Sequence, residues 1–446
     1  MSSKVELLAP AGDLMKLKYA FAYGADAVYA GVPRFSLRAR ENDFNPESLE
    51  EGVHYVHALN KKIYLTLNIF PHNRKIDSFI NALQWMEDLR PDAIIVSDPG
   101  VIHLSQQYCS SVPVHLSTQA NTVNWASVKF WYEQGVRRII LSRELSIEEI
   151  SEIRNAVPDI ELESFVHGAI CVAYSGRCLL SNYFTHRDPN QGTCTHSCRW
   201  NYKVYGEKDF SEDTTYQMLD GNYFIEEKDR PGQLLPIDED ENGTYIMNSR
   251  DLCAIRILEQ LKNAGVNSFK IEGRNKSVYY VSTVTGAYRK AIDNIESGLP
   301  FDENLEKEMF AVANRGYITG FLEKNPHQLG ENLNESHSGN QTHQFSGIVQ
   351  RIEPDNLSAV IAVRNRFEIG DEMEVLSPSG TEIFRIEKIS SIGGESLDVA
   401  HGGGIDVIIN VPAITDEYSL IRKPIPNENK YPAKTDYKNK PQRSQR

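Results

Sequence analysis

The stretch VELLAPAGDLMKLKYAFAYGADAVYA (residues 5–30) sets the pattern on which the fold of the first half of the chain depends. It begins with a short apolar run, continues through residues 14–23 with apolar side chains at helical spacing, and ends in a second apolar run at residues 26–30. Short apolar or β-branched runs indicate buried strands, whereas a spacing of three to four residues indicates an amphipathic helix. The stretch therefore predicts a strand, a helix and a second strand.

The same alternation continues along the chain. Six further strands are expected, at residues 62–67, 93–96, 112–116, 138–141, 160–166 and, after a long interruption, 268–271. Helical patterns fill gaps between them, at residues 46–59, 76–89 and 147–155. Regular alternation implies parallel strands with right-handed crossovers, and eight units favour a closed (β/α)₈ TIM-like barrel. An open doubly wound sheet is the alternative, but no G-x-G-x-x-G follows the first strand, which weakens a dinucleotide-binding interpretation.

The barrel is expected to occupy residues 1–324. Residues 201–244 are rich in Asp, Glu, Gly and Tyr without a clear period, and we interpret them as an insertion on one barrel face. A polar linker follows at residues 325–343. Residues 344–423 predict a small all-β barrel domain, and residues 424–446 a basic tail that is expected to be disordered. The runs that predict strands in the small domain lie at residues 345–352, 357–363, 372–376 and 382–389.

The composition restricts the class of protein. The chain of 446 residues has 40% hydrophobic residues and a formal net charge of -14. It has no apolar run of about 18 residues and no signal-peptide pattern, so a cytoplasmic protein without a membrane span is expected. The acidic charge argues against nucleic-acid binding, because phosphate contacts need Lys and Arg. Residues 421–446, however, carry eight basic and two acidic residues, and both a nucleic-acid arm and a solvated end stay open.

Four of the six cysteines fall in one segment, with the spacing Cys171-x₆-Cys178-x₁₅-Cys194-x₃-Cys198. In a reducing compartment such clustering points to metal binding or catalysis rather than to disulfides. Thiolates suit iron–sulfur clusters and zinc, and the absence of paired C-x₂-C knuckles favours a cluster. The first of these cysteines follows the seventh strand, where the loops of a barrel form its active face. The alternative is four unrelated buried cysteines, which the polar and glycine-rich surroundings disfavour.

Two cysteines lie outside this segment. Cys253 is expected at the start of a helix, where it is either a buried structural residue, which we prefer, or a replacement for Cys194 or Cys198 as a ligand. Cys109 is expected at the end of a helix in a structural role.

Three parts of the sequence resemble a known family. They are ESFVHGAIC (residues 163–171) with SGRCLLS (residues 175–181), the opening LLAPAG (residues 7–12) and the late KIEGR (residues 270–274). In these segments the chain resembles the collagenase-like peptidases of unassigned catalytic type, the "peptidase U" family. The resemblance covers residues 5–421 and implies a barrel with an insertion and a small C-terminal β-domain.

Several bacterial branches of this family modify RNA or quinones rather than cleave peptides. The chain is most similar to a branch that hydroxylates the wobble uridine of tRNA to 5-hydroxyuridine without oxygen, with a 4Fe–4S cluster and prephenate as hydroxyl donor. Sister branches hydroxylate a cytidine of 23S rRNA or act in ubiquinone synthesis. The resemblance implies Cys171, Cys178, Cys194 and Cys198 as cluster ligands, with Cys253 as an alternative. It also implies tRNA, prephenate and an electron donor as partners.

Polar residues near the ends of the predicted strands are candidates for substrate binding. Prephenate carries two carboxylates, which Arg binds through paired hydrogen bonds. For each arginine the alternative is a structural salt bridge. Asn68 either orients a substrate hydroxyl or caps the next helix, and His167 is either a proton donor or a satisfied loop residue. The full set is Arg38, Asn68, Gln119, Arg143, His167, Lys270, Glu272 and Arg274.

Three classes of function are compatible with these features: an RNA-modifying iron–sulfur enzyme, a peptidase, and a non-catalytic scaffold that delivers electrons. Neither H-E-x-x-H nor G-x-S-x-G occurs, and Cys171 with His167 would lack the third group that orients a thiol protease pair. The peptidase is therefore disfavoured, and the scaffold stays open. An RNA substrate requires a local basic patch at the mouth of this acidic protein.

Overall fold

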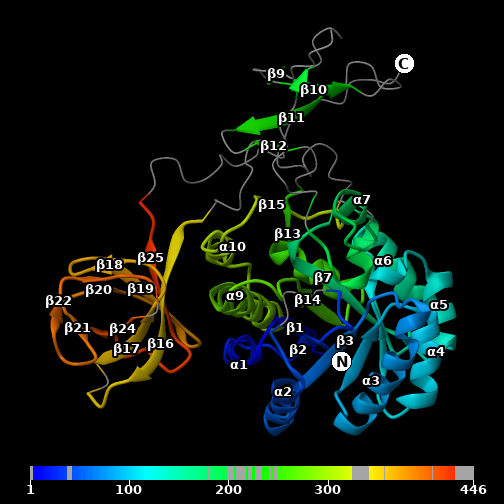
Figure 1. Cartoon of the computed structure of the whole chain (residues 1–446), viewed down its shortest axis with the longest axis horizontal. Helices are drawn as coiled ribbons and strands as arrows, with labels where there is room; N and C mark the ends of the chain where they lie inside the picture. The colour runs from blue at the N-terminus through cyan, green and yellow to red at the C-terminus, as the bar shows by residue number, and fades with distance from the viewer. Residues whose placement is uncertain are drawn as a thin grey trace. The chain divides into compact units, whose positions relative to one another are not determined.

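Eight parallel strands form a closed barrel in the first of two units into which the chain divides, residues 1–340 and 341–446 (Figure 1). The computed structural model describes residues 4–37, 43–171, 173–178, 180–195, 197, 249–323, 341–355, 357–403 and 405–426, together with short strands between residues 205 and 245. Each barrel strand pairs with the next, and the last pairs with both the first and the seventh. The predicted barrel is confirmed and the open sheet is wrong. The strands are β1 (Glu6–Ala11), β2 (Ala27–Gly31), β3 (Lys62–Leu67), β4 (Ala93–Val96), β5 (Val114–Leu116), β6 (Arg138–Ile140), β7 (Glu161–Ala169) and β14 (Ser268–Ile271).

Helices connect the strands and cover the outside of the barrel (Figure 1). Most begin at a residue whose side chain accepts a hydrogen bond from the backbone two or three residues later, as Asp13, Asn45 and Ser146 do. Such caps stabilise a helix by roughly 0.5–2 kcal/mol each, and they fix where each loop ends. The helices are α1 (Leu14–Ala22), α2 (Pro46–Ala58), α3 (Ile76–Leu89), α4 (Pro99–Tyr108), α5 (Trp125–Glu133), α6 (Ile147–Ala156), α8 (Leu258–Asn263), α9 (Val278–Glu296) and α10 (Glu303–Met309). No helix in the described ranges is both long and apolar enough to cross a membrane.

Strand β7 extends beyond its partner β14 and carries a small two-stranded addition. There β13 (Asp251–Cys253) pairs antiparallel with β7, and β15 (Tyr317–Ile318) pairs parallel with β13. Cys253 therefore ends a strand opposite His167, and its expected place at the start of a helix is wrong. The cause is tertiary, because the free edge at the end of β7 offers backbone partners that local propensity does not reveal.

Near this end of β7, Gly168 lets the chain that follows β14 approach β7 closely. Its φ is +106°, and a Cβ built on it would lie 2.5 Å from the carbonyl oxygen of Glu272. The backbone N–H of Glu272 in turn donates to the carbonyl of His167 at 2.9 Å. Only glycine fits a left-handed position with no room for a side chain. The residues that follow β7 and β14 are thus held side by side.

Of the expected insertion, the structure describes only short strands. Several other predicted features lie outside the described residues: Arg38, Cys198, most of the linker and residues 427–446. Within residues 201–245 three short strands pair antiparallel, and two more pair with each other. These are β10 (Tyr223–Glu226), β11 (Leu234–Asp240) and β12 (Gly243–Tyr245), then β8 (Tyr205–Gly206) and β9 (Gln217–Met218).

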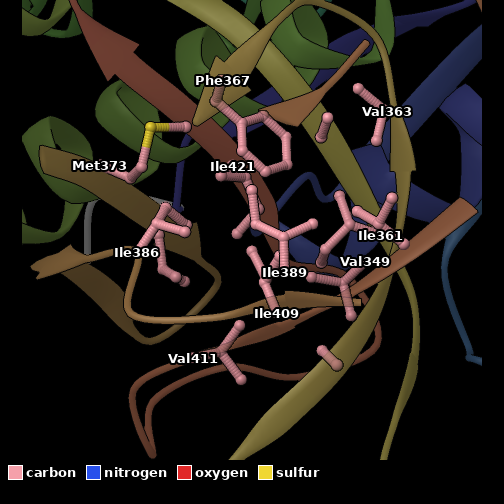
Figure 2. Packing of buried hydrophobic residues seen from close by; sticks show 14 residues of the cluster. Val349, Ile361, Val363, Phe367, Met373, Ile386, Ile389, Ile409, Val411 and Ile421 are labelled. Carbon is pink, nitrogen blue, oxygen red and sulfur yellow. The ribbon is translucent and has the colours of Figure 1, made fainter. Parts of the chain in front are cut away.

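The second unit is all-β, as predicted, and its strands pair antiparallel. Its eight-stranded sheet runs in the order β20-β19-β25-β16-β17-β24-β21-β22. Buried aliphatic side chains and Phe367 fill its interior, among them Ile361, Ile409 and Ile421 (Figure 2). The strands are β16 (His343–Ile352), β17 (Ser358–Val363), β18 (Phe367–Glu368), β19 (Glu372–Ser377), β20 (Gly380–Arg385), β21 (Ile389–Ser391), β22 (Ser396–Leu397), β23 (Val399–Ala400), β24 (Asp406–Asn410) and β25 (Leu420–Pro424).

Candidate active site at the mouth of the barrel

Three cations and two aromatic rings alternate inside the barrel towards the carboxyl ends of its strands. Lys270 Nζ lies 4.3 Å from the ring centre of Tyr29 and 5.5 Å from that of Phe165. Arg143 Cζ lies 3.9 Å from the Phe165 ring, and Arg274 Cζ lies 5.6 Å from the Tyr29 ring. Each such contact contributes about 0.5–2 kcal/mol, most where water is excluded. We call these five residues the cation row.

The central cation of the row, Lys270, is paired with a fully buried carboxylate. Glu163 Oε1 lies 2.7 Å from Lys270 Nζ, while Glu163 Oε2 lies 3.1 Å from Nη1 of Arg138. Arg138 also pairs with Glu6, at the start of β1. Burial lowers the pKa of Lys270, and the ion pair with Glu163 opposes that shift. A chain of charges therefore connects the floor of the barrel to its mouth.

Arg274 is fixed by two hydroxyl groups from neighbouring strands and loops. Its Nη1 donates to Ser36 Oγ at 2.6 Å and to Thr66 Oγ1 at 2.8 Å. Beside it, the Tyr29 hydroxyl donates to Glu272 Oε2 at 3.2 Å. Burial and the nearby Glu272 carboxylate raise the pKa of Tyr29. Tyr29 is thus held as a neutral hydrogen-bond donor next to a positioned guanidinium.

Arg143 keeps hydrogen-bonding capacity at the opposite end of the row. One of its terminal nitrogens donates to the carbonyl oxygen of Ala169 at 2.7 Å. Its Nε is buried and has no hydrogen-bond partner in the described ranges of the chain. A buried donor without a partner costs about 1–3 kcal/mol, so a ligand that accepts a hydrogen bond from it would be bound favourably.

Asn68 and Gln119 form a second polar group at the ends of β3 and β5. Asn68 Nδ2 donates to Gln119 Oε1 at 3.2 Å, and the backbone N–H of Leu37 donates to Asn68 Oδ1 at 3.1 Å. Ser117 Oγ also donates to Gln119 Oε1. Asn68 does not cap the next helix, because α3 begins after Lys75. Its amide is instead held in one orientation at the mouth.

His167 lies apart from the cation row, on β7 rather than on a loop. Its ring packs against Tyr280 and Tyr288 of α9 and Tyr317 of β15. Nδ1 lies 3.2 Å from the Tyr288 hydroxyl, and Nε2 is buried with no hydrogen-bond partner among the described residues. Burial lowers the pKa of His167 to about 3. The imidazole is therefore neutral near pH 7, which fits a packing role better than proton donation.

The described cysteines of the clustered segment lie on the loop that follows β7. Cys171 is exposed, and Cys178 and Cys194 are half-buried. Two contacts place the half-buried thiols beside the first turn of α7 (Leu180–Thr185): the backbone N–H of Leu180 donates to Cys178 Sγ at 3.3 Å, and Ser181 Oγ lies 3.6 Å from Cys194 Sγ. We call residues 171–198 the cysteine loop.

The cysteine loop offers soft donors, although no preformed metal site is seen in the part of the chain that the structure describes. There, no three His, Cys, Asp or Glu side chains are arranged to hold a metal ion. The thiol set nevertheless suits an iron–sulfur cluster, and N–H···S contacts such as that on Cys178 are typical of cluster ligands. Cys253 has other neighbours, because its Sγ lies 3.8 Å from the Tyr288 hydroxyl and burial raises its pKa to about 11.

Two aromatic residues of the site, Tyr29 and Phe165, were not predicted from the sequence. Both lie in strands whose residues are almost all buried. Parallel barrel strands are covered on both faces, so they lack the alternation that would show which side chains point inward. The sequence also gives no pattern by which Ser36 and Thr66 could be recognised as the residues that hold Arg274.

Family models match both units of the chain. The model described as peptidase family U32 matches residues 12–332, and the model of the U32 C-terminal domain matches residues 341–422. The chain belongs to peptidase family U32. The two matches follow the division of the structure into a barrel unit and an all-β unit.

This U32 member is similar to proteins named for RNA hydroxylation. It is 48% identical over 439 residues to "tRNA hydroxylation protein P" of Escherichia coli, covering 94% of this chain and 97% of that protein. It is 46% identical over 450 residues to the protein of that name in Haemophilus influenzae, covering 96% and 97%. It is 33% identical over 295 residues to "23S rRNA 5-hydroxycytidine C2501 synthase" of Escherichia coli, covering 66% of this chain and 40% of that protein.

Despite the family name, the described residues of this U32 member do not form the thiol protease pair considered above. Neither ring nitrogen of His167 bonds to Cys171, since one contacts Tyr288 and the other has no partner. Cys171 is exposed on the loop, whereas His167 is buried in β7. Nucleophilic catalysis requires a base within hydrogen-bonding reach of the nucleophile, and this geometry does not supply one.

Proposed function

We propose that this chain hydroxylates the wobble uridine of tRNA to 5-hydroxyuridine in the cytoplasm, without oxygen, with prephenate as hydroxyl donor and a 4Fe–4S cluster. The observation that carries the proposal is the similarity over nearly the whole chain to two proteins named for tRNA hydroxylation. The mouth of the barrel supports it, because its chemistry suits a small dianionic substrate.

The cation row provides the binding groups for prephenate. Arg143 and Arg274 stand at opposite ends of the row with Lys270 between them, so two carboxylates can each meet a guanidinium. The rings of Tyr29 and Phe165 offer faces against which the substrate ring can pack. Burial strengthens these interactions, since the effective dielectric is lower than in water.

The polar pair at the ends of β3 and β5 has a separate task in this proposal. Asn68 and Gln119 are held by backbone and hydroxyl contacts, so their amides orient a substrate hydroxyl or a base edge without rearranging. Preorganised polar groups of this kind reduce the entropic cost of positioning a substrate.

The cysteine loop would hold the cluster through Cys171, Cys178, Cys194 and Cys198. When bound, the cluster would supply electron transfer, for which a separate electron donor is the expected partner. The N–H of Leu180 and the hydroxyl of Ser181 already face two of the sulfur atoms, and such contacts tune clusters in proteins.

The deciding experiment is liquid chromatography–mass spectrometry of bulk tRNA from strains with and without this gene. We expect 5-hydroxyuridine derivatives to disappear on deletion and to return with the wild-type gene. Arg274→Lys should fail to restore them, because a point charge cannot replace a guanidinium that is fixed by two hydroxyls. Arg137→Gln, an exposed residue before β6, is the matched control and should restore them fully.

Unchanged tRNA nucleosides would contradict the proposed reaction. A simultaneous loss of hydroxycytidine from 23S rRNA, or of ubiquinone, would move the chain to a related reaction. The similarity to the rRNA enzyme is weaker and spans 40% of that protein, which is why tRNA is preferred.

A further inference from the structure

Four basic side chains from two neighbouring loops lie at the rim of the barrel mouth. Arg74 and Lys75 belong to the segment between β3 and α3, and Arg177 and Arg187 belong to the cysteine loop. The three arginines are exposed and Lys75 is half-buried. We call these four residues the basic rim.

Direct contacts join the two loops into one surface. The backbone N–H of Phe70 donates to the carbonyl of Asn190 at 3.1 Å, and Lys75 Nζ donates to Gln191 Oε1 at 3.1 Å. Arg177 Cζ lies 4.9 Å from the ring centre of Phe70. The same guanidinium donates through Nε to the carbonyl of Gln119 at 2.7 Å, so the rim adjoins the polar pair of the mouth.

Within the residues that the structure describes, three of the four rim cations have no carboxylate partner. Arg74, Arg177 and Arg187 form no ion pair with a described carboxylate. Acidic side chains also lie nearby: Asp188 accepts the backbone N–H of Asn190, and Glu144 accepts from Ser175. Glu144 and Glu149 act electrostatically on Tyr174. Burial and the adjacent Arg74 lower the pKa of Lys75, and the carboxylate of Asp188 opposes them.

Exposed aromatic rings accompany these cations at the same edge of the barrel. Tyr174, in the cysteine loop, is 51% exposed, and Trp125, the first residue of α5, is 52% exposed. Cations with exposed rings match unpaired nucleotides, which present phosphates for Arg and Lys and bases for stacking. Competition with polyglutamate, described below, separates an RNA from an acidic protein as the partner.

We propose that the basic rim binds the RNA strand on either side of the nucleotide that enters the mouth. Arg74 and Arg187 contact phosphates, and Tyr174 and Trp125 stack on flanking bases. The inference rests on the proposed function, because it takes RNA as the substrate. It goes beyond that function by naming the surface on which the RNA lies, which is formed by the loops after β3 and β7.

The test is binding of a fluorescent anticodon stem-loop RNA to the full, anaerobically purified protein at several salt concentrations. Arg74→Gln with Arg187→Gln removes two charges that form no ion pair with the residues the structure describes. We expect about tenfold weaker binding at physiological salt, and a log–log salt slope that is smaller by about two, one for each lost phosphate contact.

The matched control is Arg90→Gln with Arg137→Gln. Both arginines are exposed, and both lie at the opposite edge, after α3 and before β6. This pair should leave affinity and slope unchanged. Equal effects of the two double variants would overturn the rim as the RNA site.

Two further outcomes separate this inference from the proposed function. If polyglutamate displaces the RNA as well as unlabelled RNA does, the rim is a general anion surface and the RNA assignment is overturned. If the rim variant binds RNA normally and restores 5-hydroxyuridine in a deletion strain, the rim inference fails while the hydroxylation proposal stands. Unchanged nucleosides in the deletion strain would instead defeat both.

Discussion

At the residue scale, Glu163 connects Arg138, deep inside the barrel, with Lys270 near the mouth. Its two oxygens pair with Lys270 and Arg138, and its side chain is 0% exposed. A carboxylate removed from water is stable only when its oxygens keep cationic or hydrogen-bonding partners. Glu163 therefore maintains the charge of Lys270, and through it the shape of the cation row.

Glu163→Gln should destabilise the barrel by about 3–5 kcal/mol, because it leaves Lys270 buried without a counter-charge. The loss of Glu163 should also lower the pKa of Lys270 further, since the ion pair opposes the effect of burial. A lysine whose pKa is lower in the folded state than in the unfolded state makes stability rise with pH. In the variant this rise should begin at a lower pH. Urea unfolding between about pH 6 and 10 would measure it.

Two variants control for the loss of charge itself. Glu161 pairs with Arg138 but is 51% exposed, so Glu161→Gln should cost little and leave the pH dependence unchanged. Glu163→Gln with Lys270→Met should recover much of the lost stability, because both buried charges are gone. The same pH dependence in all three variants would contradict the role assigned to Glu163.

At the element scale, the length of β7 determines what its end can hold. Nine residues take it past β14, so that β13 covers one part of its edge and the cysteine loop starts directly beyond it. Arg143 donates to Ala169, the last residue of β7. The proposed cluster loop and the proposed substrate site are thus attached to the same strand end.

The cysteine variants test which thiols serve the proposed cluster. Cys178→Ala or Cys194→Ala should abolish the visible absorption of anaerobically purified protein and most of its iron, because a lost thiolate removes a ligand. Cys253→Ala and Cys109→Ala should keep both, since these thiols lie elsewhere in the fold. Loss of the absorption in Cys253→Ala with retention in Cys194→Ala would instead make Cys253 the ligand.

At the scale of the whole molecule, the second unit has a hydrophobic core of its own (Figure 2). Residues 341–446 have 15 acidic and 13 basic residues, a net charge of -2, against -12 for residues 1–340. Net charge therefore assigns RNA binding to neither unit, and the proposal rests on the local basic rim of the barrel. Among the described strands, those of each unit pair only with strands of the same unit.

We expect residues 341–426 to fold when they are expressed alone. The sheet and its core lie within this segment, and domains with their own core are generally able to fold independently. Circular dichroism should show β-structure and a single cooperative urea transition. A spectrum of an unfolded chain would contradict the expectation.

Within that isolated unit, Phe367→Ala should lower the free energy of unfolding by about 3–5 kcal/mol, because Phe367 is fully buried and its removal leaves a cavity. Ile383, on β20, is 60% exposed. Ile383→Ala should therefore change stability by less than about 0.5 kcal/mol. Similar losses in the two variants would show that the packing of Figure 2 does not stabilise the unit.

The barrel could be predicted because its strands are continuous apolar runs between amphipathic helices. The ranges of β3, β4 and β14 coincide with the predicted residues 62–67, 93–96 and 268–271. The predicted strand at residues 382–389 is instead broken into β20 and β21. The side chain of Asn410 accepts from the backbone N–H of Glu387 and donates to the backbone carbonyl of Arg385. Asn410 is distant in the sequence, so the local pattern does not predict the bend that it stabilises between the two strands.

The candidate site could be predicted only in part. Lys270 and Arg274 meet Arg143 because all three lie close to strand ends, which a barrel brings to one face. His167 is directed elsewhere, since the pairing of β14 skips one residue between Phe165 and His167. Such a bulge changes which side a residue faces, and it depends on the partner strand rather than on local sequence.

The closing strand of the barrel is made long after the strand against which it closes. β7 ends at residue 169 and β14 begins at residue 268, so a ribosome adding about 5–20 residues per second completes seven strands and the cysteine loop first. Until β14 is synthesised, two strand edges are open to incorrect pairing. Lys270, Glu272 and Arg274 arrive together at that moment, so the nascent chain joins its last substrate-binding groups to Arg143, Asn68 and Gln119 in a single docking step.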